Sequence, residues 1–522
     1  MSKSLSVRSR SSRRRSAPRA LPRPNGVIEA RVQTVGPERF GIVAVDCAKR
    51  SSKWRLYDFY GKELTPVATV EHTAPAFRQA IDALRAAVAK HRLAQVLIAV
   101  ERTSNYHLFA QRAFRDAGYE TRIVHPFASK QFRQIEDPDQ KTDEKDLGGI
   151  QRATVVGFGL LELPLDETYA TLRALVRHRR DLVRKTSVVL NQIREHLQGT
   201  LPGFADLFEG SRFWNSPVTM PLARRFASPE AVRQLGADGI AKLLNEEGVR
   251  FQQRTIDKIV GWSHQATTPY ADAVVRQRIL ADLDDDRIAK KTVISRLELE
   301  IAAHLVRTPY LLLMAIPGIN VVSAAEFAGE AGPITDYANP NRLTGRAGLF
   351  PTRYQSDEVD RTGHLVRSAN RRLRSALLFV ADNLLTSNNF FRAQGAVWKV
   401  QKIPAGIQRV RVAKRFTRLA YLMVAARKIV PHPCCRDPHY ILEKLLDFHL
   451  MRGAAPDQLR AALARAAEQI PGEMRAREAD ALRSSARKFE KARTSQAQTL
   501  GSILKEVLAD RLSLTVQSPA EV

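Results

Sequence analysis

The chain has 522 residues, enough for two to four domains, and a net charge of +28 from 82 Lys and Arg against 54 Asp and Glu. So large a positive excess disfavours an enzyme of small metabolites, because self-repulsion opposes the compact state unless a polyanion binds. Nucleic acid is the commonest such partner, with a merely basic soluble protein as the alternative from composition alone. Only three cysteines occur, which excludes a disulfide framework and fits a reducing cytosol.

The first residues carry a local share of this charge. Residues 1–24 hold eight Lys and Arg and no acid, and they are poor in apolar residues. We therefore expect residues 1–37 to be a disordered basic tail, either a nonspecific nucleic-acid arm or an over-long start.

Residues 38–160 show the pattern of an α/β domain. Two strand-like runs fill residues 38–60, and two more are expected at 95–100 and 121–124. Helical periodicity marks residues 77–93 and about 106–117. Two strands followed by an alternation of strand and helix indicate a sheet with helices packed on it.

Residues 161–307 are expected to be a long helical region. Apolar residues near a heptad spacing run through residues 165–201, at Leu172, Leu175, Leu182, Val189, Ile193 and Leu197. This segment is expected to pair with the helical span 228–308 as an antiparallel coiled coil or a dimerising stalk. A homo-oligomer, either a dimer or a tetramer, is the corresponding expectation.

A second compact, mostly α-helical domain is expected at 308–430, with a helical tail at 431–522. Its start reads as helix, Pro317-Gly318 turn and helix, the form of a helix-hairpin-helix that presents backbone N–H groups to phosphate. A plain interhelical turn fits the motif equally well. The apolar stretch Leu311 to Val322 is too short and too broken to span a bilayer. No secretory signal is visible, so we expect an intracellular protein without a membrane partner.

Four carboxylates form the strongest chemical pattern. Asp46 and Glu101 each end an apolar strand, where ligands gather at the rim of an α/β sheet. Asp143 and Asp146 are three residues apart at the start of a helical run, which places them on one face. Converging carboxylates repel unless cations lie between them, and Mg²⁺ suits such ligands. Two ions in one site can promote phosphodiester cleavage. In the structural alternative, Asp143 caps its helix and the other acids are ordinary strand ends.

The order of VAVD, IAVE and KTDEKD resembles the DEDD transposases of bacterial insertion sequences. The stretch from LMAIPGINVVSAAEF to SANRRLRSAL is similar to the C-terminal transposase domain of that family, so the resemblance covers about residues 40–430. It implies a RuvC-like N-terminal domain with an RNase H fold. It also implies that Asp46, Glu101, Asp143 and Asp146 bind the metal ions, in a protein of the bacterial cytoplasm and nucleoid. Many members of the family use an element-encoded guide RNA.

Ser356 follows Tyr354-Gln355, where the family carries a serine that is usually followed by Gly; here Asp357 follows. The resemblance implies that this serine is a nucleophile toward DNA phosphate, working beside the metal site of another protomer. From the residues alone, a serine in a polar loop is simply solvated.

Two basic runs are expected to follow phosphates, because each neutralised phosphate releases counterions. They contain Arg367, Arg371, Arg372 and Arg374 in the first run, and Arg409, Arg411, Lys414 and Arg415 in the second. A solvated face is the alternative. The spacing of His432, Cys434, Cys435 and His439 fits no common structural zinc site.

The sequence therefore predicts a Mg²⁺-dependent DNA transposase or recombinase. One alternative is a junction-resolving endonuclease that forms no covalent intermediate. The other is a non-catalytic nucleic-acid scaffold.

Overall fold

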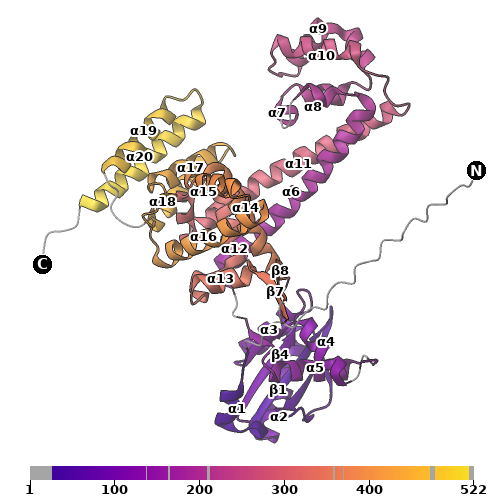
Figure 1. The fold of residues 1–522 in the computed structure, drawn as a ribbon, viewed down its shortest axis with the longest axis vertical. Coiled ribbons are helices and arrows are strands. Elements are labelled where there is room, and N and C mark those ends of the chain that lie inside the picture. The colour runs from indigo at the N-terminus through magenta and orange to yellow at the C-terminus, as the bar shows by residue number, and fades with distance from the viewer. Residues whose placement is uncertain are drawn as a thin grey trace, which may run out of the picture. The chain divides into compact units, whose positions relative to one another are not determined.

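The computed structural model describes residues 26–136, 138–140, 142–162, 165–208, 212–356, 359–367, 369–470 and 476–516. The chain divides into two compact units, Met1–Pro164 and Leu165–Val522. Figure 1 labels the elements of both units. The first 25 residues of the expected tail and Asp357 lie outside the described residues.

The first unit is a mixed sheet with helices. Its elements are α1 (Glu29–Val35), η1 (Pro37–Arg39), β1 (Phe40–Cys47), β2 (Ser51–Asp58), β3 (Ala68–Glu71), α2 (Ala74–Lys90), β4 (Gln95–Glu101), α3 (His107–Asp116), β5 (Glu120–Val124), α4 (Pro126–Glu136), α5 (Asp143–Val155) and β6 (Gly159–Leu161).

The strands lie in the order β3-β2-β1-β4-β5-β6. β1, β4 and β5 are parallel neighbours, whereas β2, β3 and β6 run antiparallel to their partners. The central strands β1 and β4 are apolar on both faces because helices cover both sides of the sheet. The α/β architecture expected for this part of the chain is therefore present.

Alternation along β1 determines which helices each side chain faces. Val43 and Val45 share a buried cluster with residues of α2 and α3. Ile42 and Ala44 share the opposite cluster with residues of α1, α4 and α5. Asp46 continues the second series, so it faces the side of α4 and α5.

The expectation of a disordered tail through residue 37 is wrong at its end. Residues 29–35 form α1, and Ile28 and Val32 are buried against the sheet. This short helix is stabilised by tertiary burial, since seven residues form no stable helix alone.

The second unit is almost entirely helical. Its elements are α6 (Glu167–Thr200), η2 (Phe204–Leu207), α7 (Arg212–Asn215), α8 (Thr219–Arg225), α9 (Pro229–Glu246), α10 (Gln253–Gln265), α11 (Ala273–Leu305), η3 (Pro309–Ala315), α12 (Val321–Ala331), η4 (Ile334–Asp336), α13 (Pro340–Ala347), β7 (Pro351–Ser356), β8 (Val359–Leu365), α14 (Arg371–Ser387), α15 (Asn389–Val400), α16 (Ala405–Ala426), α17 (His439–Leu450), α18 (Pro456–Gln469), α19 (Ala476–Glu490) and α20 (Ser495–Val516). No helix among the described residues combines the length and the apolar character needed to cross a membrane.

The two long helices α6 and α11 lie side by side, with α7 to α10 at one end of the pair (Figure 1). The two helices run antiparallel. Arg179, in the first half of α6, pairs with Glu298 near the end of α11 at 2.6 Å. At the other end, the backbone N–H of Tyr270, just before α11, donates to the carbonyl of Gly199 at the end of α6 at 2.9 Å. Of the six apolar residues expected on the seam of α6, four are buried and Leu175 and Leu182 are half-buried.

The helices after residue 430 belong to the main core of this unit. Leu445, Leu463 and Leu500 are buried in one cluster with η3, α12 and α16. They are therefore part of the folded unit and do not form a separate appendage.

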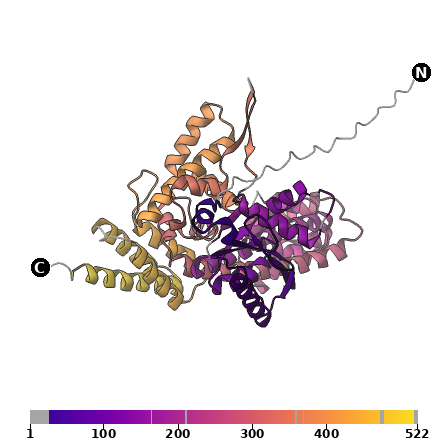
Figure 2. The same cartoon turned by 90° about the horizontal axis from the view of Figure 1, so that it is seen from below.

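Two expectations for residues 308–430 need correction. The arm before the Pro317-Gly318 turn is the 3-10 helix η3, buried from Tyr310 to Ala315, instead of an α-helix. In addition, β7 and β8 form an antiparallel hairpin that projects from the second unit in both views (Figure 1, Figure 2). Neither strand was expected, because all six side chains of β7 are exposed and show no apolar alternation.

Candidate active site

Asp46 and Glu101 lie at the same edge of the first unit's sheet. β1 and β4 are parallel and in register up to the pair Val45 and Val100, so the next residues of the two strands are neighbours. Glu101 follows Leu97 and Ala99 on the α5 side of the sheet, as Asp46 follows Ile42 and Ala44. Both side chains are half-buried.

The two carboxyl groups are hydrogen-bonded to each other, and Asp146 lies close enough to act on Glu101. Burial raises the pKa of Glu101 to about 7, and the charges of Asp46 and Asp146 act in the same direction. The hydrogen bond from Ser129 opposes this shift. These carboxyl groups therefore lie close enough for their negative charges to oppose one another.

The helix α5 carries the other two acids. Thr142 is its N-cap and accepts from the backbone N–H of Lys145 at 3.3 Å, so Asp143 is not the cap. Asp146 is half-buried near Glu101, whereas Asp143 is exposed and pairs with Lys53 of β2. The structure therefore brings Asp46, Glu101 and Asp146 together, whereas Asp143 forms an ion pair with Lys53.

The helix α4 supplies two supporting residues that the sequence did not reveal. Ser129 donates to the carboxylate of Glu101, and Arg133 lies 2.9 Å from an oxygen of Asp146. Both are buried. Their spacing of four residues puts them on one face of α4, but only knowledge that α4 packs on α5 would have connected them with the acids.

The chemistry of the clustered acids bears on whether the site fits a divalent metal. Among the described residues, no three Asp, Glu, His or Cys side chains are already arranged to hold an ion. However, the three clustered acids are hard oxygen donors, which Mg²⁺ prefers. A cation bound among these carboxylates would neutralise the charges that raise the pKa of Glu101. The residues fit such an ion, provided that Asp143 leaves Lys53 to join them.

Ser356 is the last residue of β7, exposed at the end of the hairpin. The hairpin carries an ion pair between Arg353 and Asp360, and its Tyr354 is 64% exposed. The hydroxyl of Ser356 is thus presented on an ordered strand instead of in an irregular loop.

The predicted basic residues differ in what they contact. Arg367, Arg371, Arg372, Arg411 and Arg415 are exposed, and Lys414 is half-buried. Arg374 instead donates to the carbonyl of Ala347 at 2.8 Å, and Arg409 pairs with Asp382 at 2.6 Å. These two arginines therefore also stabilise the fold.

The group of cysteines and histidines forms no metal site in the part of the chain that is described. Cys434 is buried, and its sulfur lies 2.9 Å from Nδ1 of His432. These residues stabilise a loop of the core.

Family models match both units. One, described as a transposase of the DEDD IS110 type, matches residues 43–202. Another, described as the transposase IS116/IS110/IS902 family, matches residues 310–395.

Several curated proteins are similar to this chain. An uncharacterized 43.6 kDa protein of insertion element IS110 from Streptomyces coelicolor is 27% identical over 62% of this chain and 80% of its own length. An uncharacterized 44.8 kDa protein of insertion element IS116 from Streptomyces clavuligerus is 29% identical over 45% of this chain and 58% of its own length. A probable family 20 transposase from Pseudomonas aeruginosa is 23% identical over 31% of this chain and 48% of its own length.

Both family models and the curated relatives support the DEDD transposases of insertion sequences as the family that this chain resembles. The resemblance stated from the sequence motifs is thereby confirmed, and the matched ranges fall on the sheet with its acids and on the segment that includes Ser356.

Proposed function

We propose that this protein breaks and rejoins DNA strands at the ends of an insertion element, using a RuvC-like, RNase H-type first unit. Asp46, Glu101, Asp143 and Asp146 would hold two Mg²⁺ ions. The observation that carries the proposal is the hydrogen bond between Asp46 and Glu101 at the ends of adjacent parallel strands, with Asp146 beside them.

The residues of the first unit would orient the metal ligands. Ser129 holds the carboxylate of Glu101, and Arg133 holds the carboxylate of Asp146. These contacts would keep the two carboxylates at the sheet edge. When bound, the ions would neutralise the phosphate and stabilise charge on the attacking and leaving oxygens. Lys53 would keep Asp143 paired until that carboxylate turns toward the others.

Ser356 would supply the nucleophile. Its hydroxyl oxygen would form a bond to phosphorus while the bond from phosphorus to the leaving sugar oxygen breaks. The serine proton would pass to solvent, and the leaving oxygen would take up a proton in return. An unaided serine is a poor nucleophile, so the reaction would need a metal site beside it. The family resemblance implies that this metal site belongs to another protomer. The proposal accordingly includes a homo-oligomer.

A guide RNA is the second proposed partner, beside DNA. The net charge of +28 supports a nucleic-acid surface larger than a short duplex requires. With an RNA guide, base pairing would select the DNA sequence.

The acids can be tested by strand cleavage on DNA that contains the element ends. Asp46→Asn is expected to lower Mg²⁺-dependent cleavage to the background rate, because an amide is a weak metal ligand. Asp82→Asn, an exposed acid on α2, is the matched control and should cleave normally. Full cleavage by Asp46→Asn would contradict the proposal, and an inactive wild type would favour a scaffold.

The serine can be tested by trapping. A covalent protein–DNA adduct is expected in denaturing gels with the wild type and not with Ser356→Ala. Ser387→Ala, at the end of α14, is the control. Intact nicking by Ser356→Ala without any adduct would instead support a junction-resolving endonuclease.

A further inference from the structure

We propose that one face of α14 is a groove for an unpaired nucleic-acid strand, with arginines for its phosphates and Phe379 for a base. The proposal rests on the proposed function only in that the protein acts on nucleic acid. It adds the kind of strand and the place where that strand binds.

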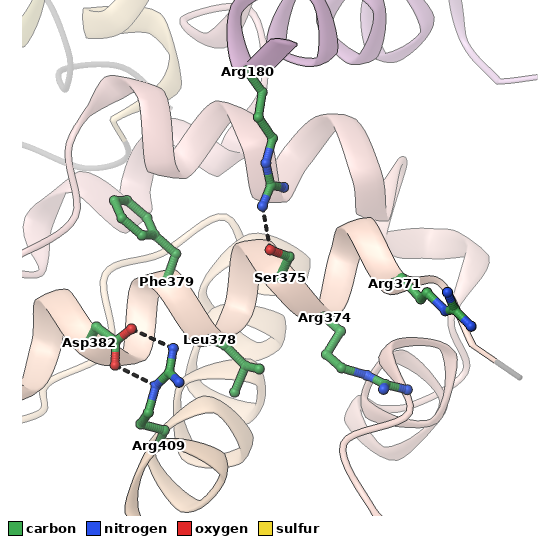
Figure 3. Close-up of a pocket in the computed structure, with 8 residues that line it drawn as sticks. All are labelled: Arg180, Arg371, Arg374, Ser375, Leu378, Phe379, Asp382 and Arg409. Carbon is green, nitrogen blue, oxygen red and sulfur yellow. Dashed lines mark hydrogen bonds and ion pairs between the residues drawn. The ribbon is translucent and has the colours of Figure 1, made fainter. Parts of the chain in front are cut away.

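A pocket of about 270 Å³ lies along this face, and Arg180 of α6 and Arg409 of α16 also line it (Figure 3). Its residues on α14 follow helical spacing from Arg371 through Ser375 and Phe379 to Asp382. Eleven residues of helix cover roughly 16 Å at 1.5 Å per residue. The face is therefore long enough for more than one backbone phosphate.

Four arginines and one aspartate line the pocket, so its charge is strongly positive. Arg180 reaches from α6 and donates to the hydroxyl of Ser375 (Figure 3). Arg409 of α16 pairs with both oxygens of Asp382, each N–O distance being 2.6 Å. Since a guanidinium has five N–H donors, each of these arginines keeps donors for a phosphate while its partner fixes its orientation.

The backbone at the start of α14 does not provide the anion site. The side chain of Asn370 already accepts from the N–H groups of Arg372 and Leu373. Phosphate recognition in this pocket therefore falls to the arginine side chains and the hydroxyl of Ser375.

Phe379 indicates an unpaired strand. Phe379 is 53% exposed, and it lines the same pocket as the four arginines. Grooves for single strands combine arginines along the backbone with aromatic side chains on which bases stack, whereas the bases of a duplex are already stacked on each other. An exposed aromatic ring in an arginine-lined groove therefore fits an unpaired strand better than a duplex.

The test measures binding of the full chain to labelled oligonucleotides by fluorescence anisotropy at fixed salt. The probes are an unpaired DNA, an unpaired RNA of the same sequence and the corresponding DNA duplex. Phe379→Ala is expected to weaken binding of an unpaired probe at least about fivefold, as loss of one stacked base does, and to leave the duplex unchanged. Phe109→Ala is the matched control, because Phe109 is 55% exposed on α3.

Arg180→Ala is expected to weaken the same unpaired probe and to reduce the slope of log affinity against log salt by about 0.7, as loss of one phosphate contact on a single strand does. Arg278→Ala removes an exposed charge from α11 outside the pocket and should leave the unpaired probe bound as before. Asp382→Asn should tighten binding about two- to fivefold, because it removes the carboxylate that competes for Arg409. A gain of this kind cannot arise from misfolding.

The proposal is overturned if Phe379→Ala binds every unpaired probe within twofold of the wild type, or if it weakens the duplex equally. A loss with DNA alone assigns the groove to a displaced DNA strand, and a loss with RNA alone assigns it to a guide strand; either result supports the groove. Cleavage by Asp46→Asn would refute the proposed chemistry but would leave these binding ratios unaffected, so the two failures are distinguishable.

Discussion

Lys444 binds the carbonyl groups on both sides of the Pro317-Gly318 turn. Its amino group donates to the carbonyl oxygens of Met314, Ile316 and Ile319, at 3.0, 3.3 and 2.7 Å. The Pro317-Gly318 turn, which from sequence resembled a phosphate-binding hairpin, is therefore held from inside the core through its carbonyl groups. These bonds involve the carbonyl groups alone, so phosphate binding by the N–H groups of the turn stays a prediction.

Burial lowers the pKa of Lys444 from 10.5 to about 7. Between these values the unfolded chain binds a proton that the folded chain does not, so stability increases as pH rises from about 7 toward 10.5. Lys444→Met lacks this contribution. The difference in unfolding free energy, wild type minus variant, should therefore be larger at pH 10 than at pH 7.

Urea unfolding at both pH values measures this difference, and the groups common to the two proteins cancel. An equal difference at pH 7 and pH 10 would show that Lys444 keeps its proton throughout this range.

At the scale of elements, the candidate site depends on close packing of α4 against α5. A Cβ added at Gly149 would lie 2.6 Å from the carbonyl oxygen of Ser129 and 3.1 Å from Cβ of Arg133. These are the two residues that hold Glu101 and Asp146. Glycine at this position lets the supporting helix approach the helix that carries the acids.

Gly149→Ala is expected to destabilise the first unit by about 1–3 kcal/mol, because the backbone of α4 must move. Gly148→Ala is the control: its Cβ would meet only the flexible end of Arg152, and alanine favours the helix. Thermal melting compares the two variants. A Gly149→Ala protein as stable as Gly148→Ala would refute the packing argument.

At the scale of the whole molecule, the C-terminal helices complete the second unit. η3 is buried from Tyr310 to Ala315, and α17 and α18 pack on it. Without these helices its leucines would be exposed to water, at a cost of roughly 25 cal/mol for each Å² of apolar surface.

A chain that ends at residue 430 should therefore be insoluble or should bind a hydrophobic dye without a cooperative melting transition. A chain that ends at residue 516 keeps α17 to α20 and serves as the control. Cooperative melting of the shorter chain at the temperature of the longer one would show that these helices are dispensable.

The amino-acid pattern alone predicted the class of protein and the elements that carry the candidate acids. Apolar runs that end in Asp46 and Glu101 predicted two strands and a shared edge, because alternation and periodicity act within one segment. The spacing of Asp143 and Asp146 likewise predicted one helix face.

The partners of these residues became visible only in the folded chain. It paired Asp143 with Lys53, brought Ser129 and Arg133 to the acids, and used Arg374 to hold carbonyl groups. It also placed Ser356 on a hairpin whose strands carry no apolar pattern. The physical reason is that ion pairs and hydrogen bonds join residues far apart along the chain, and their distances follow from how helices pack on the sheet and on each other.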